Sequence, residues 1–191
     1  MNEAEPIRLA QQGDENAWIS LIRHHQTAVF RFAYLLVGDA DDAEDVVQDV
    51  FISAFRALDR FDVERPLRPW LLQITKNLAA NQRRSMRRYV ALLRRWWQEP
   101  PQGTDSTAPN LSAENNAQQA AGLLWQAIRR LNQADQEVIY LRYFLELSVA
   151  ETAAALNIAE GTVKSRLSRA LERLRAIVKH EFPELGEEVV A

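Results

Sequence analysis

The apolar residues of this chain recur at steps of three and four positions, which is the spacing that places side chains on one face of a helix. One run extends from Trp18 to Tyr34 and a second from Val46 to Leu58. Similar runs resume after Trp70 and after Leu123, and no long stretch alternates with the two-residue period of a strand. The pattern therefore predicts an all-α fold.

The sequence also makes three local predictions. Phe55 is expected in the core with the other apolar residues of the second run. Asp41 is expected to cap the helix of that run, and residues 61–69, which contain two prolines, are expected to form a loop.

A polar segment divides this helical pattern into two blocks. Residues 99–116 are rich in Pro, Gly, Ser, Thr, Asn and Gln, and they carry too little apolar surface to offset the entropy cost of ordering them. We therefore expect two small helical domains, at residues 1–88 and 120–180. A flexible linker that includes a short amphipathic helix joins them at 89–119, and an acidic, frayed tail follows at 181–191.

Residues 148–175 predict a helix-turn-helix. Ser148 and Glu151 have the spacing of a capping box for a short first helix, and Asn157 stands where the turn needs a left-handed backbone. A longer helix then begins at Glu160, with an apolar side and a side rich in basic and hydroxyl groups. A helix of this kind can enter the major groove of DNA.

The composition excludes several classes of protein. The chain has no cysteine, and His24, His25 and His180 show no recognisable ligand spacing, so we expect no metal and no other cofactor. No apolar run approaches the roughly 18 residues of a membrane span, and the N-terminus lacks a signal-peptide pattern, which predicts a cytoplasmic protein without direct membrane insertion. No glycine-rich phosphate loop or nucleophile elbow occurs, so we expect neither an enzyme nor a small-molecule substrate.

Acidic and basic residues are segregated along the chain, although the formal net charge is only −3 at pH 7. Acids crowd residues 39–49, whereas residues 83–95 contain arginines and no acid. A second basic stretch at 164–179 is interrupted only by Glu172. This segregation predicts an acidic face for one partner and basic faces for another.

The chain contains three segments in this order: AEDVVQDVF at 43–51, RPLRPWL at 65–71 and EGTVKSRL at 160–167. Together they resemble the extracytoplasmic-function (ECF) sigma factors of bacterial RNA polymerase. The resemblance covers about residues 5–88 as sigma domain two and about 120–180 as sigma domain four. It implies a promoter-specificity subunit that binds the polymerase core, directs transcription initiation at specific promoters and is commonly controlled by an anti-sigma factor. Asn157 departs from the family, which usually has glycine there.

The resemblance also implies three contact sites. Core polymerase, through a coiled coil of its largest subunit, would be bound by Asp45, Gln48, Asp49 and Ile52. The minus-ten promoter element would be contacted by Lys76, Asn77, Arg83 and Arg84, with Asn77 facing a flipped base. The minus-thirty-five element would be contacted by Thr162, Lys164, Ser165, Arg166 and Arg169.

Some of these residue types also have purely local structural roles. The acids at positions 41, 42 and 44 need only complement the helix macrodipole, whereas Asp45 and Asp49 form a repulsive i,i+4 pair that an external cation would relieve. Asn77 is equally well accounted for by a hydrogen bond to local backbone. The rival functions are an ordinary helix-turn-helix regulator, whose N-terminal block senses or dimerises, and an enzyme.

An apolar stripe precedes the polar segment and consists of Tyr89, Leu92, Leu93, Trp96 and Trp97. An exposed patch with two indoles usually marks a contact surface. We hypothesise that it packs against the second domain in the free protein and holds a closed arrangement that polymerase must open. The alternative is that the stripe completes the core of the first domain.

Overall fold

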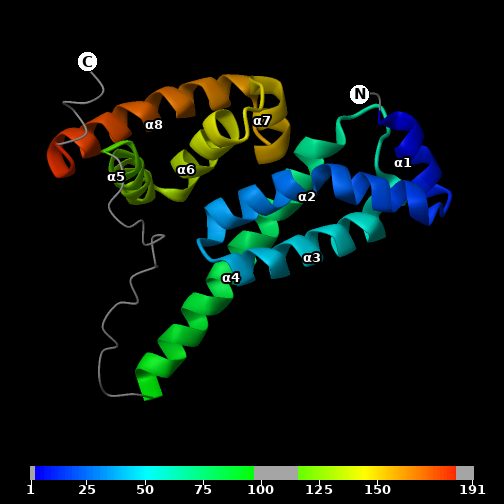
Figure 1. Ribbon diagram of the computed structural model, residues 1–191, viewed down its shortest axis with the longest axis horizontal. Helices are drawn as coiled ribbons and strands as arrows, with labels where there is room; N and C mark the ends of the chain where they lie inside the picture. Colours follow the sequence, from blue (N-terminus) through cyan, green and yellow to red (C-terminus); the bar gives the residue numbers. More distant parts are fainter. Residues whose placement is uncertain (1–2, 97–115, 184–191) are drawn as a thin grey trace.

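The computed structural model describes residues 3–96 and 116–183, and the side chains of 3–84 and 120–183. Within these ranges the chain is helical and contains no strand (Figure 1). The all-α prediction is therefore confirmed.

The first domain is a bundle in which the second, third and fourth helices pack against one another. Asp14 and Asp39 cap two of its helices by accepting hydrogen bonds from the N–H groups of Ala17 and Asp42, at 3.0 and 3.1 Å. Gly38 ends the second helix with a φ of +86°, a left-handed conformation that favours glycine. The elements are α1 (Ala4–Gln11), α2 (Glu15–Val37), α3 (Ala40–Ala57), the 3-10 turn η1 (Leu58–Arg60) and α4 (Leu67–Trp96).

The second domain contains the predicted helix-turn-helix. Ser148 and Glu151 form a full capping box, with the Glu151 N–H 3.1 Å from Ser148 Oγ and the Ser148 N–H 2.8 Å from Glu151 Oε2. Asn157 ends the first helix in the left-handed region at φ 55°. The elements are α5 (Asn116–Arg130), α6 (Gln133–Ile139), the π-helical turn η2 (Tyr140–Phe144), α7 (Val149–Leu156) and α8 (Glu160–Glu181).

A buried carboxylate joins two helices of this domain. The side chain of Asp135 on α6 is only 4% exposed, and it accepts hydrogen bonds from Arg173 on α8 and from Asn132 Nδ2, the latter at 2.8 Å. Because a buried charge is costly unless it is paired, this contact fixes how α8 lies against α6.

The two domains are packed against each other, with α7 against α4 and η2 against α2 (Figure 1). Two cations of α4 donate to backbone carbonyls of the second domain: Arg68 Nη2 lies 2.8 Å from Leu145 O, and Lys76 Nζ lies 3.2 Å from Leu156 O. Leu156 is the last residue of α7 and Leu145 follows η2. These carbonyls lie at helix ends, where a cation is favourable.

Three local predictions were wrong. Phe55 was expected in the core but is 56% exposed, because it lies at the edge of the buried side of α3, where its ring contacts Trp18 of α2 with centroids 5.6 Å apart. The third helix is capped by Asp39 rather than by an acid at 41. The fourth helix begins at Leu67, within the expected loop at 61–69. Pro69 is compatible with this helix because it lies in the first turn, where the N–H group that proline lacks has no acceptor within the helix.

The fourth helix also continues to Trp96, across the domain boundary expected at residue 88, and its C-terminal half stands clear of the other helices in Figure 1. The apolar stripe at 89–97 has its side chains outside the described residues, so the hypothesis of a stripe-based contact stays untested. The two domains are in contact through α4 and α7, and this packing is called the closed arrangement below.

Candidate functional site

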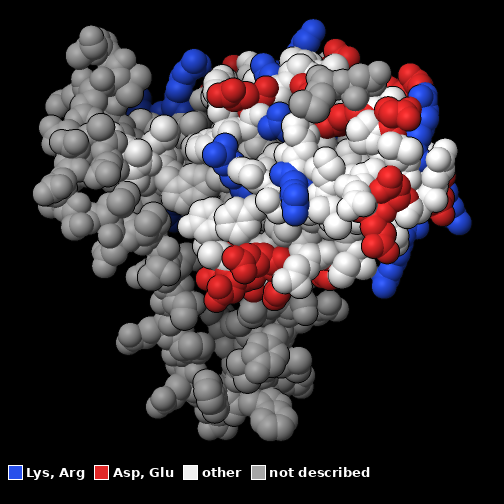
Figure 2. Space-filling view, turned by 45° about the vertical axis from the view of Figure 1, so that its right-hand side comes forward, with Lys and Arg blue, Asp and Glu red and all other residues white. Residues whose placement is uncertain are grey.

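The exposed side of α3 carries the residues expected to bind polymerase. Asp45, Gln48, Asp49 and Ile52 are all exposed, because positions three and four apart share one face of a helix. On the opposite side Val46 is 1% exposed and Val50 is fully buried in the bundle. The face turned forward in Figure 2 has several acidic patches, with uncharged surface and Lys or Arg side chains between them.

Apolar side chains adjoin this acidic stripe. Ile52 is 48% exposed, and Phe55, one turn further on, is 56% exposed and packs against Trp18. Sequence reasoning missed Phe55 as a surface residue, because helical periodicity alone cannot separate an inward position from one at the edge of the buried face. Exposed apolar groups beside charged ones are typical of protein-binding surfaces.

The residues expected at the minus-ten element all lie on α4, but they differ in accessibility. Asn77 and Arg84 are exposed, and Arg84 Nη2 donates to Asn81 Oδ1 one turn earlier. Arg83 is half-buried. Lys76 is also half-buried, because its ammonium donates to the Leu156 carbonyl at the end of α7. The closed arrangement therefore engages Lys76 in a contact between the domains.

The residues expected at the minus-thirty-five element form the outer side of α8. Lys164, Ser165 and Arg169 are exposed, and Arg169 Nε donates to Ser165 O at 3.1 Å, which holds the guanidinium along the helix. Thr162 and Arg166 are half-buried. The inner side of the same helix is anchored by two fully buried residues, Val163 and Ala170. A rigid helix thus presents a basic and hydroxyl-bearing surface.

Two residues of the second domain that lie outside α8 have shifted pKa values. Burial raises the pKa of Tyr140 to about 12, which keeps the phenol neutral in the core of the second domain. Hydrogen bonds from the backbone N–H and hydroxyl of Ser148 lower the pKa of Glu151. The stabilisation from Glu151 is present above its unfolded pKa and is lost as the pH falls through the folded value.

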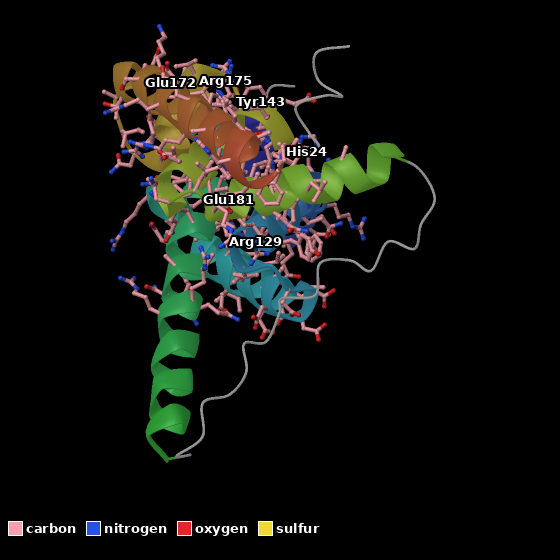
Figure 3. All side chains as sticks on the ribbon, turned by 90° about the vertical axis from the view of Figure 1, so that its left-hand side faces the viewer. His24, Arg129, Tyr143, Glu172, Arg175 and Glu181 are labelled. Atoms are coloured by element: carbon pink, nitrogen blue, oxygen red, sulfur yellow. The ribbon has the colours of Figure 1, made fainter. Side chains whose placement is uncertain are left out.

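An open cavity of about 470 Å³ lies where the domains meet. Residues of α2 and α4 line one side and residues at the end of η2 line the other; they include His24, Arg31, Arg68, Phe144 and Glu146. Figure 3 shows His24 near Tyr143, the neighbour of Phe144 in η2.

Two of the three histidines, His24 and His25, have a carboxylate neighbour in space although their sequence spacing does not indicate a ligand pair. Glu3 Oε1 lies 2.9 Å from His25 Nε2 and 3.5 Å from His24 Nε2. No sequence signal indicates this, because Glu3 is brought to the histidines only by the packing of α1 on α2.

Comparisons with known proteins agree with the two-domain architecture. Residues 21–89 match the family described as sigma-70 region 2, and residues 121–174 match sigma-70, region 4. The fold and its surfaces thus define a sigma-70-type protein built from these two regions. No helix within the described residues has the length and apolar character needed to cross a membrane.

Individual relatives define the class of sigma factor more closely. The chain is 36% identical to the ECF RNA polymerase sigma factor SigL of Mycobacterium tuberculosis over 158 residues, covering 82% of this chain and 85% of the relative. It is 34% identical to the RNA polymerase sigma factor NccH of Alcaligenes xylosoxydans xylosoxydans over 172 residues, covering 90% and 92%. The chain belongs to the ECF sigma factors, and it is a promoter-specificity subunit that directs RNA polymerase in transcription initiation.

Two solved structures resemble the whole chain. CnrH in complex with the cytosolic domain of CnrY aligns with a TM-score of 0.69 at 25% identity, over 95% of this chain and 99% of CnrH. RpoE from Bartonella quintana, in complex with the anti-sigma factor NepR, aligns with a TM-score of 0.64 at 28% identity, over 85% and 96%.

Proposed function

We propose that this sigma factor docks on the polymerase core through the exposed side of α3. The observation that carries the proposal is the placement of Asp45 and Asp49 on a solvent-facing helix side whose reverse is buried. Two like charges at i,i+4 destabilise an isolated helix by a few tenths of a kcal/mol, and a basic partner would remove this penalty. The expected partner is the basic coiled coil of the largest subunit, with Gln48 and Ile52 completing the contact.

Promoter recognition is assigned to α4 and α8. On α4 the exposed amide of Asn77 can both donate to and accept from the edge of an unstacked base, while Lys76, Arg83 and Arg84 neutralise nearby phosphates. On α8 the exposed Arg169 is a candidate for bidentate contact with guanine in the minus-thirty-five element. The supporting contacts on α8 are assigned to Thr162, Lys164, Ser165 and Arg166.

The closed arrangement is proposed as the resting state. The minus-ten and minus-thirty-five elements are named for their positions, which are about 25 base pairs apart. This separation corresponds to about 85 Å along B-form DNA. A helix of 22 residues such as α8 is only about 33 Å long, and α7 is in contact with α4. The two reading helices cannot reach both elements in this arrangement, so binding to a promoter requires the domains to separate.

A protein that binds the closed form would keep the sigma factor inactive, because it would shift the equilibrium away from the open form. RpoE of Bartonella quintana, whose solved structure aligns over both domains, is bound by an anti-sigma factor. We therefore propose an anti-sigma partner for this chain too. We also propose that the chain acts in the cytoplasm with the polymerase and has no catalytic activity of its own.

Docking is tested by affinity capture of purified core polymerase with the wild-type chain and with Asp45→Lys combined with Asp49→Lys. The double variant is expected to lose capture while keeping its helical circular dichroism, because both positions are exposed. Asp59→Lys reverses an exposed charge outside α3 and serves as the control. Normal capture of the double variant would show that the acidic side of α3 is not the docking surface.

A further inference from the structure

Glu3, His24 and His25 converge at the junction of α1 and α2. Their possible metal-ligating atoms all lie within 4.8 Å of one another. The two imidazole rings are in edge-to-face contact, with centroids 4.8 Å apart, and Glu3 Oε1 approaches the Nε2 atoms of both. Glu3 is the residue before α1, whereas both histidines lie on α2, about twenty residues later in the sequence.

The geometry around His25 differs from that of an ordinary hydrogen bond. Its side chain is 4% exposed, and its Nε2 makes no hydrogen bond although Glu3 Oε1 lies 2.9 Å away, which places the oxygen off the N–H direction. Two ligands of one Zn²⁺, each at about 2.0–2.1 Å, are themselves about 3.3 Å apart, and neither points at the other. Glu3 Oε1 and His25 Nε2, at 2.9 Å, are within about 0.4 Å of this spacing, so a small outward movement of the two side chains would let both atoms bind one ion.

We propose that Glu3, His24 and His25 bind a divalent transition-metal ion, with Zn²⁺ as the ion that suits them best. Two imidazoles and one carboxylate are ligands that Zn²⁺ accepts in tetrahedral sites. The His24 side chain is 51% exposed, so an ion can enter from solvent and complete its coordination with water. The absence of cysteine from the chain removes thiolate competition for the same ion.

The surroundings of the cluster contain charges of both signs. Arg31 and Arg68 line the adjoining cavity and weaken cation binding, while Glu146 on its other side offsets part of that repulsion.

An ion at this position would cross-link two segments that pack against each other. Glu3 immediately precedes α1, and the histidines lie in the middle of α2. The ion would therefore fasten the N-terminus to the bundle. This role is independent of the proposed polymerase and promoter contacts, which lie on α3, α4 and α8.

The test is titration of the full chain, produced without a histidine tag, with Zn²⁺ by calorimetry and with Co²⁺ by visible absorption. We expect one ion per chain, a d–d spectrum typical of tetrahedral nitrogen and oxygen ligands, and a rise in the melting temperature. His24→Ala and Glu3→Gln should each weaken binding by about tenfold or more. Both positions are at least partly exposed, so these variants avoid the folding risk of replacing buried His25.

His180→Ala is the matched control, because it removes an exposed histidine on α8, outside the cluster. Affinity that is unchanged by His180→Ala but reduced by both cluster variants supports the site. Failure of the wild-type chain to bind either ion at micromolar concentrations would overturn the proposal. The same conclusion would follow from binding that persists in His24→Ala or Glu3→Gln, or that disappears in His180→Ala.

Discussion

Two cations on α4 connect the domains in this structure, and removing them tests whether their hydrogen bonds stabilise the closed arrangement. Arg68 donates to Leu145 O at 2.8 Å and Lys76 donates to Leu156 O at 3.2 Å. Arg68→Met combined with Lys76→Met keeps the aliphatic stems and removes both charged donors. The carbonyl acceptors belong to the backbone, so the second domain itself is unchanged.

The size of the effect follows from these two bonds. A hydrogen bond from a charged group contributes about 1.5–3 kcal/mol, and both contacts are only partly buried, which favours the lower end. Their joint loss should therefore cost about 3 kcal/mol of inter-domain free energy, or roughly a hundredfold shift toward the open form. A population that is about 99% closed would become about evenly divided.

Fluorescence energy transfer can measure this shift, because the chain has no cysteine and two introduced ones are labelled selectively. Ser20→Cys in α2 and Ala176→Cys in α8 are exposed positions, one in each domain. Transfer efficiency should fall in the double methionine variant and stay unchanged in Arg60→Met, an exposed control on η1. Equal efficiency in all variants would refute the idea that these cations hold the closed form.

Substitutions at four further positions test the second domain. In binding-site selection, Arg166→Ala or Arg169→Ala should cost about 1–3 kcal/mol and relax one promoter position if the arginine reads a base, but weaken all sequences alike if it contacts phosphate. In chemical denaturation, Asn157→Ala should lower the free energy of unfolding by about 1 kcal/mol, because alanine tolerates the left-handed backbone at φ 55° poorly, whereas Asn157→Gly should not. Arg173→Met should destabilise the domain by about 1–2 kcal/mol, since it leaves the carboxylate of Asp135 buried without its cation.

The features that sequence predicts best are those determined by neighbouring residues. The capping box at Ser148 and the left-handed residue Asn157 are local, so the helix-turn-helix could be predicted before the structure. The stripe of Asp45 and Asp49 on one side of α3 follows from helical spacing in the same way. Which molecules those side chains contact stays a prediction.

Features created by tertiary packing were not predictable from spacing. Phe55 has the apolar character of a core residue, and only the position of α2 leaves it exposed beside Trp18. Lys76 was expected to face DNA, but its carbonyl partner in α7 is brought near by the association of the two domains. The Glu3 cluster likewise depends on the packing of α1 against α2.

This chain gives the polymerase its choice of promoter, and run-off transcription measures that function. Fragmented genomic DNA is transcribed with purified core polymerase in the presence and absence of the chain. We expect transcripts from a limited set of start sites that require both components. Promoter-specific transcripts that form without the chain, or none when the chain and core are combined, would contradict it.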